Sequence, residues 1–148
     1  MVNNNVILAL ASPAGGGKNF FADQIKKYSG KTTYILSLAD ALKKDLYQFL
    51  LDKFNIDIFT CSRDDKNLVR DILVAVGRVN RKISKGTCYT KIIDGQIKNI
   101  KDSIIILADL RYIEYPEDEY YWVKNHGGKL IYIERAGIDY PNEDERIN

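Results

Sequence analysis

A glycine-rich turn that ends in a lysine is the strongest candidate for chemistry in this sequence. Residues 12–19 read Ser-Pro-Ala-Gly-Gly-Gly-Lys-Asn and follow the apolar run at residues 6–10. Backbone N–H groups in such a turn point toward anionic oxygens, and the start of a following helix adds partial positive charge. The turn approximates the pattern G-x-x-x-x-G-K-[ST]. It predicts a site for the phosphates of ATP formed by Pro13, Ala14, Gly15, Gly16, Gly17, Lys18, Asn19 and Phe20.

The turn departs from that pattern at Ser12 and Asn19, and the next residue, Phe20, is apolar. Ser12 stands at the first glycine position, and neither Asn19 nor Phe20 offers a hydroxyl to a metal ion or a phosphate. The Asn19 side chain offers a carbonyl oxygen instead, which is an acceptable ligand for a hard cation. We expect Phe20 to pack beneath the following helix with Ile25. The alternative to a phosphate site is a flexible strand-to-helix turn with a surface lysine.

A single acidic residue is the candidate for metal binding. Asp109 directly follows the apolar run at residues 103–108, which is typical of a buried strand. A carboxylate at such a strand end holds Mg²⁺, usually through water, beside bound phosphates. The alternative is an aspartate that only terminates the strand.

Basic residues are spread through the middle of the chain and beyond. Transfer of a phosphoryl group requires positive charge around the moving group, and guanidinium groups grip phosphates in a bidentate manner. As a group these residues predict a lid or a clamp for an acceptor phosphate, although a solvated surface role is the alternative for each one. They are Lys43, Arg63, Arg70, Arg78, Arg81 and Arg111.

The hydrophobic pattern predicts strands that alternate with helices. Strands are expected at residues 6–10, 32–38, 103–108 and 129–134, and helices around 19–28, 42–53, 68–76, 87–100 and 117–126. Gly77 is expected to end one helix, residues 77–87 to be irregular, and Thr87 to cap the next helix. The order indicates an α/β domain with a mainly parallel sheet of four to five strands and helices on both faces.

Composition narrows the class of protein further. The 148 residues have the size of one domain, with 45% hydrophobic residues and a net charge of +2. This balance predicts neither a nucleic acid nor a membrane as a partner, and the apolar runs are too short to span a bilayer. Cys61 and Cys88 fit no metal-binding spacing and are expected to be reduced thiols in a cytoplasm-like compartment.

The aromatic residues and the single histidine are expected to be structural. His126 precedes two glycines at a predicted helix end, where a capping role is favoured over catalysis. Trp122 and the nearby tyrosines predict core or interface, and their density leaves a homodimer as an open alternative. Tyr89 could stack on a base but begins the apolar face of its helix. The tyrosines near Trp122 are Tyr112, Tyr115, Tyr120 and Tyr121.

Over residues 5–137 the chain resembles the deoxynucleoside monophosphate kinases of bacteriophages. Its glycine turn, "SPAGGGKNFFADQI", is similar to the P-loop of nucleoside monophosphate kinases. The strings "SLADALKK" and "RDILVAVGRVNR" match further segments of that family. The string "ILADLRYIEYPEDEYYWVKNHGGKLIYIERAG" is similar to the family's strand ending in Asp-x-Arg, its acidic helix, Gly-Gly and a last strand.

The resemblance implies a P-loop NTPase three-layer sandwich, a single domain over residues 1–148. It implies ATP- and Mg²⁺-dependent phosphorylation of a nucleoside monophosphate, in the host cytoplasm if a phage encodes the chain. Residues 40–100 would bind the acceptor and form a lid. A non-catalytic nucleotide-binding or structural protein, and a kinase of another small molecule, remain alternatives. We expect Lys18, Arg78, Arg81 and Arg111 to be catalytic, Asp40, Lys43, Arg70 and Tyr89 to bind the acceptor, and Asp109 to bind the metal.

Overall fold

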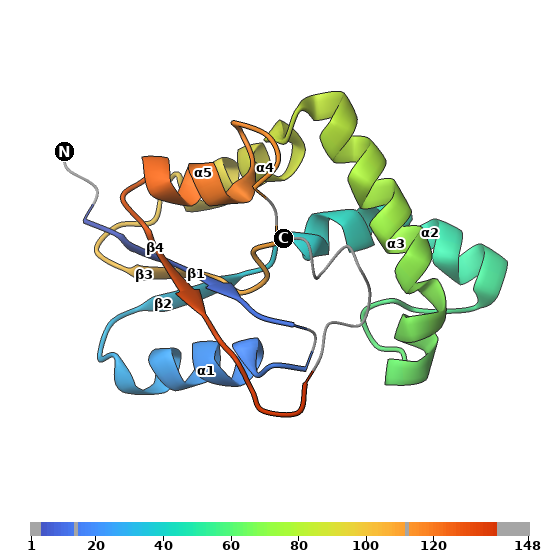
Figure 1. Cartoon of the computed structure of the whole chain (residues 1–148), viewed down its shortest axis with the longest axis horizontal. Coiled ribbons are helices and arrows are strands. Elements are labelled where there is room, and N and C mark those ends of the chain that lie inside the picture. Colours follow the sequence, from blue (N-terminus) through green and yellow to red (C-terminus); the bar gives the residue numbers. More distant parts are fainter. Residues whose placement is uncertain (1–3, 14, 112, 139–148) are drawn as a thin grey trace.

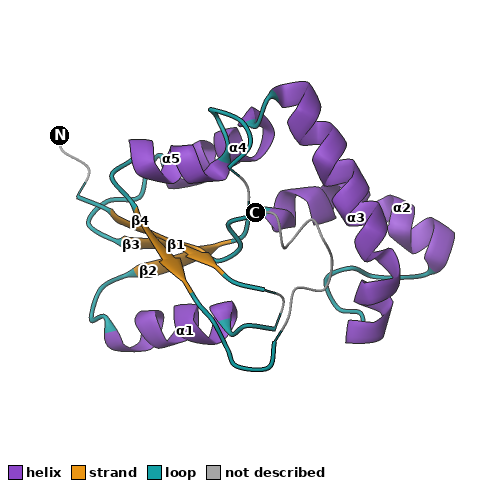
Figure 2. Cartoon of the chain, viewed as in Figure 1, coloured by secondary structure: helices purple, strands orange, loops and turns teal. Residues whose placement is uncertain are grey.

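The computed structural model of the chain describes residues 4–13, 15–111 and 113–138. Four strands and five helices are present in this part of the chain, which confirms the predicted α/β class (Figures 1 and 2). The elements in chain order are β1 (Val6–Ala11), α1 (Lys18–Tyr28), β2 (Thr33–Leu36), α2 (Ala39–Phe54), α3 (Arg63–Ser84), α4 (Thr87–Ile97), β3 (Ile104–Leu107), α5 (Glu119–Asn125) and β4 (Lys129–Tyr132).

The four strands are all parallel and lie in the order β2-β3-β1-β4. The chain leaves β1 toward the β2 edge, and it leaves β3 toward the opposite edge, where β4 lies. The direction of the connections therefore reverses between β1 and β3. In parallel sheets, ligands bind beyond the carboxyl ends of the strands at such a switch point. The glycine turn follows β1 and Asp109 follows β3, so both lie at this position.

Helices cover both faces of the sheet, which is compatible with a three-layer α/β sandwich. Figure 1 shows α1 on one face, with α4 and α5 on the other. On the α1 side, Ala22 packs with Leu10 and Ile106 of the sheet. On the other side, Ile93 and Trp122 pack with residues of β1 and β3. Burial of these continuous apolar strands on both faces is the main stabilising term.

Helices α2 and α3 form an arm beside the sheet (Figure 1). The arm has its own apolar cluster, in which Leu50 of α2 and Val69 of α3 pack around Ile56 and Ile58 of the connecting loop. The side chain of Ser62 caps α3 by accepting a hydrogen bond from the Asp65 N–H at 3.1 Å. The arm therefore has a small hydrophobic core of its own, separate from the core around the sheet.

The structure corrects the expected end of α3. This helix continues through Gly77 to Ser84, where Lys85 and Gly86 adopt positive φ angles of 53° and 92°. Gly77 lies where α3 packs closely against α2, because a Cβ atom there would lie 3.3 Å from the Leu42 Cδ2 atom. The basic residues after it belong to the helix: Arg81 pairs with a buried carboxylate, and Arg78 and Lys82 are exposed.

The predicted cap of α4 is also wrong. Gly86 is the N-cap residue and has no side chain, and the Ser84 hydroxyl accepts the Cys88 N–H of the first turn at 3.2 Å. The Thr87 hydroxyl donates instead to the Ser84 carbonyl oxygen at 3.0 Å. Within the described residues, no helix combines the length and the apolar character needed to cross a membrane.

Candidate functional site

The glycine turn after β1 contains two glycines in the left-handed backbone conformation. Gly15 and Gly17 have φ angles of 80° and 99°, which residues with a side chain rarely adopt. Gly16 is buried, and a Cβ atom on it would lie 2.0 Å from the Ser12 Oγ atom. All three glycines are therefore required by local geometry. No side chain caps α1, so its first N–H groups remain available to an anion.

Lys18 is the first residue of α1, and its ammonium group lies over the turn. Its Nζ atom donates a hydrogen bond to the Ser12 carbonyl oxygen at 2.6 Å. A full positive charge and the start of a helix therefore meet at one loop. Together they favour the binding of a negatively charged ligand.

The side chain of Phe20, two residues after Lys18, does not lie where the sequence predicted. Phe20 is 70% exposed, so the prediction that it packs beneath α1 is wrong. The inner face of α1 is occupied by Ala22 and Ile25, which leaves Phe20 on the side of the turn. Asn19 is also exposed, Pro13 is buried, and the predicted contact residue Ala14 lies outside the described residues.

A cavity of about 760 Å³ lies over the turn, and we call it the loop cavity. It is bordered by the turn, the start of α1, the start of α2 and the carboxyl end of β3. Its lining includes Gly15, Gly16, Gly17, Lys18, Asn19, Phe20, Ala39, Asp40, Lys43, Asp109 and Arg111.

A second cavity of about 250 Å³ lies between the arm and the sheet, and we call it the arm cavity. One part of its wall is apolar, with Leu42, Leu73 and the buried Tyr89, whereas another part is cationic. Four residues line both cavities, so the two spaces adjoin. The cationic residues are Lys43, Lys66, Arg70, Arg81 and Arg111, and the shared residues are Ala39, Lys43, Asp109 and Arg111.

Asp109 stands at the junction of the two cavities and also caps α2. Its carboxylate accepts hydrogen bonds from the Ser37 hydroxyl at 2.7 Å, the Leu38 N–H at 2.7 Å and the Ala39 N–H at 2.8 Å. This cap is the negative charge that the start of a helix favours. It ties the end of β3 to the first turn of the arm.

The geometry of Asp109 decides how it could hold a metal ion. A carboxylate has about four acceptor positions, so three bonds leave one for a metal-bound water. The Asp109 carboxylate therefore has room for one further interaction, either with a metal ion directly or with a metal-bound water. Among the described residues, no three His, Cys, Asp or Glu side chains are grouped so as to hold a metal ion.

Other predicted site residues divide between the cavities. Asp40 lines the loop cavity and forms an ion pair with Lys43 at 3.0 Å. Arg70 and Tyr89 line the arm cavity. Arg78 is exposed on α3 and is not among the described residues that line either cavity.

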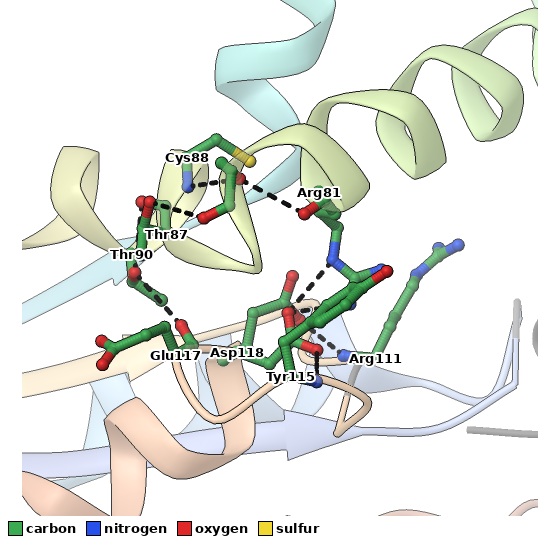
Figure 3. Close-up of polar contacts among 10 residues, drawn as sticks. Arg81, Thr87, Cys88, Thr90, Arg111, Tyr115, Glu117 and Asp118 are labelled. Carbon is green, nitrogen blue, oxygen red and sulfur yellow. Dashed lines mark hydrogen bonds and ion pairs between the residues drawn. The ribbon is translucent and has the colours of Figure 1, made fainter.

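Arg81 is buried in an ion pair with Asp118. Its Nη2 and Nε atoms donate to the Asp118 Oδ1 atom at 2.9 and 3.3 Å (Figure 3). The Oδ2 atom of Asp118 accepts the Tyr115 N–H at 2.7 Å. With exposed fractions of 3% and 0%, the two side chains fasten the end of α3 to the loop before α5. Arg81 thus has a structural partner as well as a place at the arm cavity.

Glu119 is a buried acid that the sequence analysis did not select. It lines the arm cavity, and its Oε2 atom accepts the Arg111 N–H at 2.9 Å. Burial, with a smaller contribution from the nearby Asp109 carboxylate, raises the pKa of Glu119 to about 8, although the hydrogen bond from the Arg111 N–H opposes the shift. Glu119 therefore positions the backbone of Arg111 at the junction of the cavities.

The titration of Glu119 gives a prediction for stability. The folded protein holds a proton on Glu119 that the unfolded chain releases near pH 4.5, so the free energy of unfolding should fall as the pH rises from 4.5 to about 8. The full effect is on the order of 5 kcal/mol. The Glu119→Gln variant keeps an acceptor for Arg111 but does not titrate, so its stability should vary less over this range. Urea unfolding of both proteins across that range measures the difference, and parallel curves would contradict the prediction.

Two basic residues at the site were not among the selected contact residues. A Cβ atom on Gly15 would lie 3.8 Å from the Arg63 Nη2 atom, so the start of α3 reaches the glycine turn. Lys66 lines the arm cavity. Arg63 was noted in the sequence only as one of several scattered basic residues, and nothing local distinguishes either one. Both residues reach the site only through the tertiary position of the arm, which no local sequence pattern indicates.

The remaining expectations concern residues away from the cavities. His126 is the C-cap residue of α5, and Trp122 is buried in the core, as predicted. Tyr121 is 40% exposed, and Tyr112 lies outside the described residues. Cys61 and Cys88 are free thiols.

Comparison with known proteins adds no family assignment. No protein-family model matches the chain, and no curated protein matches it significantly.

Proposed function

We propose that the protein is a P-loop kinase that transfers the γ-phosphoryl group of ATP to a nucleoside monophosphate, with deoxynucleotides as the preferred acceptors. One observation carries the proposal. A cavity over a glycine turn with Lys18 adjoins a second cavity lined by arginines, and Lys43, Asp109 and Arg111 lie in both. A transfer reaction requires two binding spaces with a charged junction between them.

The reaction is a direct displacement at phosphorus. A phosphate oxygen of the acceptor forms a bond to the γ-phosphorus of ATP, and the bond from that phosphorus to the β,γ-bridging oxygen breaks. The electron pair of the broken bond leaves with ADP, and the products are ADP and a nucleoside diphosphate. Because the nucleophile is already an anion, the protein needs no general base for this step.

The chain's residues would act by position and charge. The turn and Lys18 hold the donor phosphates, and Lys43 and Arg111 lie where negative charge passes between the cavities. Arg70 faces the acceptor from the arm. Asp109 would hold Mg²⁺ through water, and the ion would neutralise charge on the donor phosphates.

Simultaneous binding of two nucleotides tests the proposal. The protein should be saturated with a non-hydrolysable ATP analogue and then titrated with each deoxynucleoside monophosphate in a calorimeter. We expect a second site with one monophosphate per chain. Strict competition between the two ligands would indicate a single nucleotide site and would contradict two functional cavities.

The placement of arginines on α3 predicts how acceptor binding responds to mutation. Arg70 lines the arm cavity and Arg78 does not, so Arg70→Lys should raise the KM for the monophosphate about tenfold or more. Lysine keeps the charge but loses the bidentate grip on a phosphate. Arg78→Lys should have a smaller effect, and the KM for ATP should change little in either variant. Equal changes in the KM for the monophosphate and the KM for ATP would show that Arg70 is not specific to the acceptor site.

A second candidate is a nucleotide-binding protein without transfer activity. It is favoured by Asp109, whose carboxylate already caps α2 through three hydrogen bonds, and by the absence of hydroxyls at residues 19 and 20. Such a protein would bind ATP with Lys18 but give no diphosphate with any acceptor.

A further inference from the structure

Helix α3 exposes a row of apolar side chains along its length. Leu68, Val79 and Ile83 have exposed fractions of 75%, 54% and 79%. Ala75 is exposed and Ile72 is half-buried between them. Steps of four, three, four and four residues place all five on one side of a helix. We call these five residues the α3 stripe.

Apart from Ile72, which is half-buried against the apolar cluster of the arm, the α3 stripe lies away from the side of the helix that faces the fold. The opposite side carries the buried Val69, Gly77 and Arg81, and it lines the arm cavity through Leu73. The helix therefore buries one face within the chain and still presents a second apolar face. Extended apolar surface of this kind marks an interaction site.

Charged residues beside the stripe are arranged by sign along the helix. At 100° per residue, Asp64, Asp71, Arg78 and Lys82 all fall on the same side of the stripe. All four are exposed, with the acids in the first half of α3 and the basic residues in the second half. When two copies of the helix run in opposite directions, the acids of one copy therefore lie beside the basic residues of the other.

We propose that the α3 stripe is the contact surface of a homodimer, in which two copies of α3 pack antiparallel about a twofold axis near Ala75. This arrangement brings the acidic half of one helix beside the basic half of the other, and it places Asp71 near the partner's Arg78 and the partner's Lys82. The small side chain of Ala75 at the axis allows close approach of the helices. The inference rests on α3 alone and does not depend on the proposed kinase activity.

The size of the surface sets the expected strength of the dimer. A helix of 22 residues is about 33 Å long, so one helix pair gives a contact at the small end of specific interfaces. We therefore expect a dissociation constant of about 1–100 µM. A negatively charged lipid surface is a poorer occupant, because its repulsion of Asp64 and Asp71 would offset its attraction for Arg78 and Lys82.

Sedimentation velocity of the full chain over a range of concentrations tests the pairing. The wild type should shift from monomer to dimer, and Val79→Asp should remain monomeric because it would bury an uncompensated charge. Tyr28→Asp is the matched control, since Tyr28 is 70% exposed on α1, and it should dimerise like the wild type. Circular dichroism establishes that both variants fold. A wild type that stays monomeric at all concentrations, as it would if residues 139–148 or lipid occupied the stripe, would overturn the proposal.

A charge exchange tests the antiparallel order. Asp71→Lys and Lys82→Asp should each raise the dissociation constant several-fold, because each places like charges together twice across the twofold axis. The double variant Asp71→Lys/Lys82→Asp restores opposite charges and should dimerise close to wild-type strength. Dimerisation that is weaker still in the double variant would rule out the antiparallel pairing.

Discussion

Replacing Lys18 with alanine should reduce phosphoryl transfer by about 10²–10³-fold or more, while the protein remains folded. The Lys18 ammonium lies over the glycine turn, 2.6 Å from the Ser12 carbonyl oxygen. On the proposed function it compensates negative charge on the donor phosphates, and alanine leaves that charge to the backbone N–H groups alone. The rate of ADP formation with ATP and the best acceptor measures the loss.

A second lysine on the same helix provides the control for this experiment. Lys26 lies in the last turn of α1 and is exposed, away from both cavities, so Lys26→Ala should retain full activity. ATP affinity, measured by calorimetry, should fall in Lys18→Ala and not in Lys26→Ala. If Lys18→Ala kept wild-type affinity for ATP, the glycine turn would not be the donor site.

Replacing Asp118 with alanine should destabilise the protein by about 3–5 kcal/mol, the largest stability effect that we expect. Asp118 is 0% exposed and accepts two hydrogen bonds from Arg81 and one from the Tyr115 N–H. Its removal leaves the Arg81 guanidinium buried without its carboxylate. Urea unfolding of wild type and variant measures the difference.

A paired replacement separates the ion pair from any catalytic role of Arg81. Arg81→Met/Asp118→Leu removes both charges together, so its free energy of unfolding should lie much closer to the wild type than that of Asp118→Ala. If Arg81 also grips the acceptor from the arm cavity, the double variant should be stable and still have a raised KM for the monophosphate. A double variant as unstable as Asp118→Ala would show that the pair is not the source of the loss.

Local patterns were sufficient to predict most of the fold. Continuous apolar runs predicted the four strands, and helical periodicity predicted the five helices, in nearly the correct places. Each pattern reflects which faces of the element are buried. The glycine turn was also predictable, since a positive φ angle at Gly15 and Gly17 follows from the residue type.

The end of α3 could not be predicted from local signals. Gly77 has the appearance of a helix stop, and a basic segment follows it. In the structure, Leu42 of another helix lies close to Gly77. No residue near Gly77 in the sequence indicates this contact. The same limit applies to Gly86, where a Cβ atom would lie 2.7 Å from the Asp118 Oδ1 atom.

The candidate site was only partly visible in the sequence for a related reason. Lys18, Asp109 and Arg111 were found because they follow recognisable strands or turns. Glu119 stands in an acidic segment that has the composition of a solvated surface, and only the tertiary structure buries it. The capping of α2 by Asp109 likewise joins residues about 70 positions apart.

The most direct test of the kinase assignment is turnover with a complete set of acceptors. Purified protein with ATP and Mg²⁺ should be assayed against each common ribonucleoside and deoxynucleoside monophosphate, with Lys18→Ala as the blank and the diphosphate product identified by chromatography. The proposal predicts formation of ADP and a nucleoside diphosphate in equal amounts with at least one deoxynucleotide, at a rate far above the blank. Folded, ATP-binding protein that gives no diphosphate with any acceptor would contradict it.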